Sequence, residues 1–261
     1  MSVMPQSSRL HAPPPAPNGR FSPQAGLPGR VDRLYQVVDD MELIYVADPM
    51  CSWCWGFHPS MTAIADHHLD LPVRVVVGGL RPGPSAKRLD DDMRAFLLHH
   101  WQQVEERSGQ PFNPAGLDRE DWTYDTEMAD MAVVAMRKAA PGDTLRFLGR
   151  VQRAFYAEAV DVTAAEAYGG LVAGFPVDAG SFVGDLADGV DRDDTWSDFA
   201  LARSWGISGF PAVVGRQGQS GALLARGWMA PGQLDQVVHS WLSSTGHEVV
   251  DGATCAVGDI C

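Results

Sequence analysis

The chain has 261 residues, of which 45% are hydrophobic, and its 33 acidic residues outnumber 20 basic ones to give a net charge of −13. Nucleic acids and anionic membranes bind basic surfaces, so this charge argues against both as partners. No run of about 18 apolar residues could span a bilayer, and no signal peptide is evident, so we expect a cytoplasmic protein. Four cysteines are too few for a disulfide framework. In a reducing compartment a close cysteine pair is typically catalytic or metal-binding.

The first 80 residues divide into an arm and a strand–helix–strand unit. Residues 1–38 are rich in proline and small polar residues, so we predict a disordered arm there. The apolar runs at 41–47 and 72–77 predict two buried strands, and residues 51–68 between them have helical spacing. Because two strands joined through a helix form a right-handed crossover, this pair should be parallel.

Helical spacing dominates the middle of the chain, and strand character returns near its end. Predicted strands at 211–215 and 222–226 are joined by a glycine-containing turn at 217–221, which indicates a hairpin. An amphipathic helix over 231–242 follows, with Pro231 in its first turn. The helices predicted in the middle span 89–106, 125–139, 144–158, 164–173, 180–187 and 193–205.

The predicted order is β-α-β, then helices, then β-β-α. The two outer parts are the halves of a thioredoxin-like core, an α/β fold, and the middle is a large helical insertion. The expected division is a disordered arm at 1–38, the core at 39–80 and 206–245, an inserted helical domain at 81–205 and a flexible C-terminal tail at 246–261.

The strongest functional signal is the pair Cys51 and Cys54, at the start of the first predicted helix. Cysteines three residues apart in a first helical turn lie on one face, within range of a disulfide. The unpaired N–H groups and the dipole of the helix start stabilise a thiolate at Cys51, and the thiolate is the species that attacks disulfides. Cys54 lies further into the helix and is less exposed, so it suits the role of the resolving thiol.

A zinc site is the alternative for the same residues. His58 lies four residues after Cys54, so Cys51, Cys54 and His58 could supply three ligands. The fourth would come from elsewhere, for example Cys255 or Cys261. The residue after Cys54 is not histidine, which excludes a c-type haem. Because the cysteine pair opens a helix inside a β-α-β pattern, we favour redox chemistry and expect no bound metal and no cofactor.

A second signal is Gly209-Phe210-Pro211, at the start of the third predicted strand. A proline there must lie at a strand start or a sheet edge. In a core of this kind a cis proline commonly faces the dithiol, which favours a cis Phe210–Pro211 bond over an ordinary trans one. Proline has no N–H to crowd the sulfur, and the backbone before it can bind an extended substrate. We therefore expect Phe210 and Gly209 to contact substrate.

Three aromatic residues and one carboxylate flank the dithiol. Trp53 is the candidate for substrate contact at the surface, whereas we expect Trp55 and Phe57 to pack in the core. Asp48, just before the site, has two interpretations that stay open. Its carboxylate could accept the proton of the resolving thiol. Its side chain could equally cap the turn before Pro49.

These motifs resemble the DsbA family of thioredoxin-like oxidoreductases, and most closely its cytoplasmic FrnE-like branch. The resemblance rests on DPMCSWCWG at 48–56 and SGFPAVV at 208–214, and FLGRVQRAFYAEAVDVT at 147–163 supports it. It extends over about residues 41–245. It implies a thioredoxin core with an inserted helical domain, and protein disulfide oxidoreductase or isomerase activity.

By this resemblance Cys51 is the nucleophile, Cys54 the resolving thiol and Pro211 the cis proline. The sequence departs from the family in two places. Ser52-Trp53 stands where the periplasmic oxidants have Pro-His, and Phe210 stands where many relatives have Val or Thr. Because the dipeptide between the cysteines tunes thiolate stability and hence the reduction potential, strongly oxidising behaviour is not carried over.

The tail contains the other two cysteines, Cys255 and Cys261, with five residues between them. A loop this short closes at modest entropic cost, so the two cysteines are a candidate second redox pair. The alternatives are two unpaired thiols without a role, or zinc ligands shared with the first pair.

Protein thiols and disulfides are the expected partners, with glutathione as a further candidate, and either a monomer or a homodimer is expected. Two other functions fit the same fold. One is a glutathione-dependent isomerase of the kappa-transferase type, which generally has serine at the position of Cys51. The other is a peptide-binding, chaperone-like module without enzymatic activity. A first cysteine followed by a resolving cysteine favours electron transfer over both.

Overall fold

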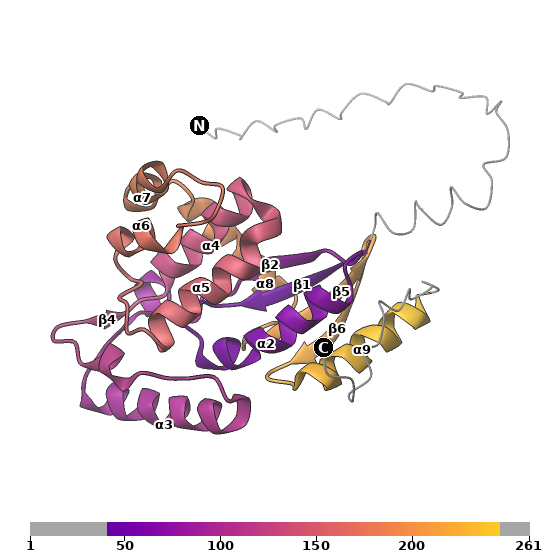
Figure 1. Ribbon diagram of the computed structural model, residues 1–261, viewed down its shortest axis with the longest axis horizontal. Coiled ribbons are helices and arrows are strands. Elements are labelled where there is room, and N and C mark those ends of the chain that lie inside the picture. Colours follow the sequence, from indigo (N-terminus) through magenta and orange to yellow (C-terminus); the bar gives the residue numbers. More distant parts are fainter. Residues whose placement is uncertain (1–40, 246–261) are drawn as a thin grey trace, which may run out of the picture.

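The structure, a computed structural model, describes residues 41–245 (Figure 1). The predicted arm at 1–38 and the predicted tail at 246–261, with Cys255 and Cys261, lie outside the described residues. Within the described part, no helix is both long and apolar enough to cross a membrane.

The centre of the fold is a mixed sheet of β1 (Met41–Ala47), β2 (Val73–Val77), β5 (Ala212–Gln217) and β6 (Ser220–Arg226), in the order β2-β1-β5-β6. β1 pairs in parallel with β2 and antiparallel with β5, and Tyr45 lies opposite Val75 and Val213. The predicted parallel pair and the predicted hairpin of β5 and β6 are both confirmed. Valine and isoleucine occur in β1, β2 and β5, because β-branched side chains pack well on a pleated surface.

Helices cover both faces of this sheet. α2 (Ser52–His67) and α9 (Pro231–Ser244) pack against each other on one face, and α8 (Arg192–Ser204) packs against β2 on the other (Figure 1). Successive residues of β1 alternate between the two sides, as a strand requires. Leu43 and Tyr45 belong to the large core, whereas Ile44 and Val46 pack in a smaller cluster with Ala202 of α8.

The other helices lie between β2 and β5 in the sequence. α4 to α7 gather beside one edge of the sheet, and α3 runs below them (Figure 1). α3 and α5 both contact α2, so the insertion is packed against the helix that carries the cysteine pair. The bounds are α3 (Asp91–Ser108), α4 (Glu127–Ala139), α5 (Thr144–Tyr156), α6 (Tyr168–Leu171) and α7 (Ala179–Asp188).

Apart from shifts of a few residues in helix ends and short 3₁₀ turns, the structure differs from the predicted elements in the following places. The single helix predicted at 164–173 is a 3₁₀ turn at Ala165–Ala167 followed by the four residues of α6, where Gly169 and Gly170 weaken a longer helix. The hairpin strands are longer than predicted, and Ser220 pairs with Gln217. The short strands β3 (Lys87–Arg88) and β4 (Thr123–Tyr124) were missed, because two residues carry no periodic signal.

Candidate active site

The chain turns sharply between β1 and α2, and this turn places Cys51 at the helix start. The carboxylate of Asp48 accepts a hydrogen bond from the Met50 N–H at 2.8 Å, and the Cys51 N–H donates to the Asp48 carbonyl at 3.1 Å. Cys51 is the N-cap residue, and its carbonyl accepts from the N–H groups of Cys54 and Trp55 at 3.0 Å each. Both cysteines therefore lie in the first turn, as predicted.

The two sulfurs differ in exposure. Both cysteines are free thiols. Cys51 retains 6% of its surface and Cys54 none. The Cys51 thiol lies 3.7 Å from the carbonyl oxygen of Phe210, to which it donates. The Phe210–Pro211 bond is cis, so the predicted cis proline beside the dithiol is confirmed.

The loop before β5 packs against the backbone that follows β2. The Phe210 ring lies directly over Gly78, where a Cβ atom would come within 2.1 Å of the ring. Only glycine allows that approach, so Gly78 positions the carbonyl that faces Cys51. In the sequence, Gly78 directly follows the strand predicted at 72–77.

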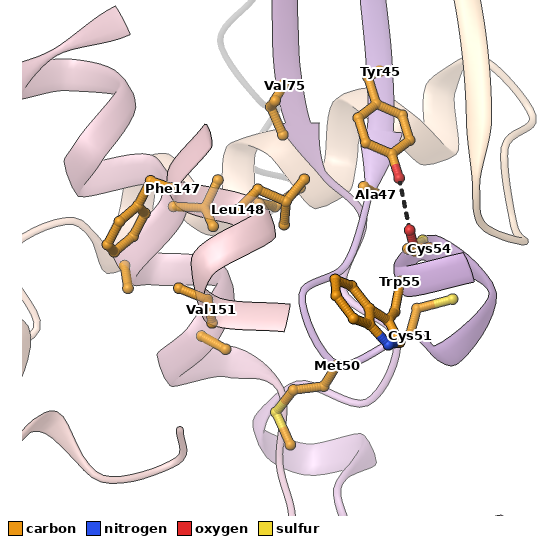
Figure 2. Close-up of a cluster of buried hydrophobic side chains, with 14 of the residues drawn as sticks. Tyr45, Ala47, Met50, Cys51, Cys54, Trp55, Val75, Phe147, Leu148 and Val151 are labelled. Carbon is orange, nitrogen blue, oxygen red and sulfur yellow. Dashed lines mark hydrogen bonds between the residues drawn. The ribbon is translucent and has the colours of Figure 1, made fainter. Parts of the chain in front are cut away.

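Cys54 lies in a closed, mostly apolar environment. Burial, followed by the hydrogen bond with Cys51 and the charge of that residue, raises the pKa of the Cys54 thiol well above its usual value. The Asp48 backbone N–H donates to the Cys54 sulfur and partly offsets this effect on the pKa. Behind the site, the Tyr45 hydroxyl donates to the Cys54 carbonyl at 3.4 Å (Figure 2). Cys54 is therefore held as a thiol until a neighbour removes its proton.

Asp48 is fully buried beneath the dithiol. One carboxylate oxygen accepts from Met50 and the other accepts from the Leu80 N–H at 2.6 Å. The first contact is the predicted capping of the turn. Burial raises the pKa of Asp48, and its hydrogen bonds oppose that shift. A buried carboxyl group with a raised pKa beside Cys54 is also suited to accept a proton.

A groove of about 610 Å³ opens on the other side of the dithiol. The Arg107 guanidinium lies 5.0 Å from the centre of the Trp228 ring, and the Trp228 indole N–H donates to the Gly56 carbonyl at 2.9 Å. Trp53 lines this groove, whereas Gly209 is exposed and is not part of its wall. The groove is lined by Trp53, Gln103, Glu106, Arg107, Phe210, Gly227 and Trp228.

Several neighbours of the dithiol have structural roles. Trp55 and Phe57 are buried in the core, as expected. His58 stacks on Trp55 and presses against Gly149 of α5, where a Cβ atom would lie 2.1 Å from the ring. Burial lowers the pKa of His58 to about 4, so its ring is neutral. Among residues 41–245, no three His, Cys, Asp or Glu side chains form a group that could hold a metal ion.

Sequence reasoning missed Arg107, Trp228 and Asp130. Arg107 is one of several charged residues near the end of α3, and Trp228 follows β6 with no motif around it. Asp130 lies in α4, and its carboxyl group is fully buried next to that of Asp48. No local pattern distinguishes these residues, because each approaches the dithiol only through the tertiary fold.

No protein-family model and no curated protein matches the chain. Solved structures do. A candidate protein disulfide isomerase from Nitrosomonas europaea is 33% identical with a TM-score of 0.71, and the match covers 78% of this chain and 98% of that one. The cytosolic disulfide reductase DsbM from Pseudomonas aeruginosa, solved with GSH, is 24% identical with a TM-score of 0.64 over 77% and 99% of the two chains. Oxidised BdbD from Bacillus subtilis shares the fold at 10% identity, with a TM-score of 0.52 over 78% and 88%.

The likeness to the Nitrosomonas protein extends over nearly all of that chain. It includes the thioredoxin core and the helical insertion that the sequence predicts. In this chain a Cys-X-X-Cys pair, Cys51 and Cys54, lies at the start of α2 in that core. The chain belongs to the DsbA family of thioredoxin-fold thiol–disulfide oxidoreductases.

Proposed function

We propose that this enzyme reduces or isomerises disulfides of peptides and unfolded proteins, with Cys51 as the nucleophile and Cys54 as the resolving thiol. The observation that carries the proposal is the difference between the two sulfurs. Cys51 lies beside the carbonyl of Phe210, one of the residues that line the groove, whereas Cys54 is fully enclosed. A substrate in the groove can therefore reach Cys51 first.

The reaction transfers two electrons from the enzyme dithiol to the substrate disulfide in two exchange steps. The Cys51 thiolate attacks one sulfur of the substrate disulfide, the substrate S–S bond breaks, and one substrate thiol leaves. Cys54 then loses its proton and attacks the Cys51 sulfur. The mixed disulfide breaks, the second substrate thiol leaves, and the Cys51–Cys54 disulfide remains. Two thiols from a donor such as glutathione return the enzyme to the dithiol by the reverse exchange.

Glutathione is the proposed electron donor, and the cytoplasm is the proposed compartment. DsbM is a cytosolic disulfide reductase that was solved with GSH. In this chain, Arg107 and Gln103 offer donors for a carboxylate of such a peptide, and Trp228 and Trp53 offer apolar surface beside them. The motifs around Cys51 and Pro211 support placing the chain in the FrnE-like branch of the family.

Two measurements test this proposal. Reduction of insulin with glutathione as the electron donor should proceed with the wild-type enzyme. The reduction potential of the dithiol should lie between those of thioredoxin, about −270 mV, and protein disulfide isomerase, about −180 mV. A potential near that of DsbA, about −120 mV, would instead make the enzyme an oxidant. Failure to reduce insulin with glutathione as the electron donor would contradict the proposal.

A further inference from the structure

Asp130 of α4 brings a second carboxyl group against Asp48. Its side chain is fully buried, and the two carboxyl groups lie within hydrogen-bonding distance of each other. One oxygen of Asp130 accepts from the Thr126 hydroxyl at 3.2 Å. Among the described residues, the other oxygen has no hydrogen-bond donor. Burying a charged carboxylate oxygen that has no hydrogen-bond donor costs free energy. The contact between the two carboxyl groups therefore requires a proton on one of them.

The surroundings do not neutralise two negative charges. Arg137 already forms an ion pair with Asp198, and Arg81 lies over the ring of Tyr124. The remaining titratable neighbours are acids that would add negative charge if ionised. The groups around the two carboxyls are Cys51, Cys54, Arg81, Tyr124, Arg137, Tyr156, Tyr168 and Asp198. Two adjacent carboxyl groups in such a place hold one proton between them.

The hydrogen bonds decide which carboxyl group keeps the proton. Asp48 accepts two backbone N–H groups, which stabilise its charged form. Asp130 has one hydroxyl donor only, and its free oxygen is the atom that can carry the proton and donate to Asp48. Burial and the charge of Asp48 also raise the pKa of Asp130 well above its usual value. The proton therefore belongs to Asp130.

We propose that Asp130 is a positioning residue of the dithiol, which keeps its proton at neutral pH and donates a hydrogen bond to Asp48, so that Asp48 remains a carboxylate beside Cys54. The proposal rests on the role of Cys54 as the resolving thiol. When Cys54 attacks, its S–H bond breaks and the proton passes to the Asp48 carboxylate. An S–S bond then forms between Cys54 and Cys51, and the electron pair of the broken mixed disulfide leaves on the substrate sulfur.

The test compares a substitution of Asp130 that keeps its hydrogen-bonding groups with one that removes them. Asp130→Asn keeps a donor toward Asp48 and an acceptor for Thr126, whereas Asp130→Ala removes both. The readout is the pH dependence of the Cys54 attack, measured as release of a fluorescent peptide from its mixed disulfide with Cys51. In Asp130→Ala the acid limb should move up by about one pH unit, the effect of losing a hydrogen bond to a charged group. Asp130→Asn should restore the wild-type acid limb.

A second readout does not depend on exchange at all. Infrared spectra near pH 7.5 should contain the carbonyl band of a protonated carboxyl group in the wild-type protein, and Asp130→Asn should lack it. A wild-type protein without that band would overturn the proposal, and so would an unchanged acid limb in Asp130→Ala. If Asp130→Ala does not fold, the infrared comparison decides alone. If no mixed disulfide forms at Cys51, the proposed function fails while the infrared test of Asp130 still stands.

Discussion

On its outer side the dithiol is next to a groove whose charged residues, Glu106 and Arg107, are exposed to solvent. On its inner side the ionisable groups are Asp48 and Asp130, and neither has any exposed surface. Water and salt screen the outer charges, so each contributes little to binding. The inner charges lie in a low-dielectric interior, where one proton changes the energy of the site strongly. We therefore expect the groove to make modest contributions to substrate binding and the interior to control proton transfer.

The largest expected effect separates the two sulfurs. Cys51→Ser should abolish exchange completely, because the substrate disulfide then meets no thiolate. Cys54→Ser should still form mixed disulfides at Cys51 but should not resolve them, so these adducts accumulate. Mass spectrometry of the protein after incubation with an oxidised peptide measures both results. Equal loss in both variants, with no adduct in Cys54→Ser, would contradict the assigned roles.

The next effect tests the inner side alone. Asp48→Asn should slow the attack of Cys54 by about 10²-fold, the low end of what a positioned proton acceptor contributes. Formation of the mixed disulfide at Cys51 should stay within about twofold of wild type, because that step needs no proton from Cys54. Stopped-flow measurement of the two steps separates them, and circular dichroism checks that the variant is folded. Equal slowing of both steps would show that Asp48 acts on the fold of the site and not on the proton.

Much of this arrangement could be predicted from local sequence. The buried run of β1, the cysteine pair that follows it and the glycine-phenylalanine-proline segment before β5 each carry a signal within a few residues. Asp130 could not be found this way. It lies in α4 between Ala129 and Met131, like any polar residue of an amphipathic helix, and only the packing of α4 brings it to Asp48. Arg107 and Trp228 could not be predicted from local sequence either, because 121 positions separate them in the chain.

The pH dependence of folding stability should report the protonation of Asp130 independently of thiol–disulfide exchange. The folded state raises the pKa of Asp130, so it binds that proton more tightly than the unfolded chain, whose aspartates titrate near 3.9. In the wild type, the contribution of Asp130 to the free energy of unfolding is therefore fully present below about pH 4 and is lost as the pH rises toward the pKa of the folded state. Asp130→Asn does not titrate and escapes that loss. Relative to wild type, its unfolding equilibrium should become about tenfold more favourable to the folded state between pH 5 and pH 6.

Urea unfolding at several pH values measures this difference, and Asp178→Asn provides a control of opposite sign. Asp178 is the N-cap of α7, accepts the Ser181 N–H at 2.8 Å, and has a lowered pKa because of that hydrogen bond. Its contribution is present above the unfolded pKa and is lost as the pH falls, so Asp178→Asn should lose stability relative to wild type as the pH rises. A pH-independent difference for Asp130→Asn would mean that Asp130 holds no extra proton in the folded state.

The smallest expected effect tests the outer side. The Arg107 guanidinium stacks on Trp228 and is exposed, so its contribution to binding an anionic peptide should be about 0.5–1 kcal/mol. Arg107→Ala should therefore raise the KM for glutathione by about 2- to 5-fold and leave kcat unchanged. Arg107→Lys keeps the charge but not the planar stack on Trp228, so its KM should lie between those of the wild type and Arg107→Ala. Because the charge is screened, the difference between wild type and Arg107→Ala should shrink as salt is added. A fall in kcat with unchanged KM would instead mean that Arg107 acts in the chemical step. The groove and the buried carboxyl groups would then not have separate roles in binding and in proton transfer.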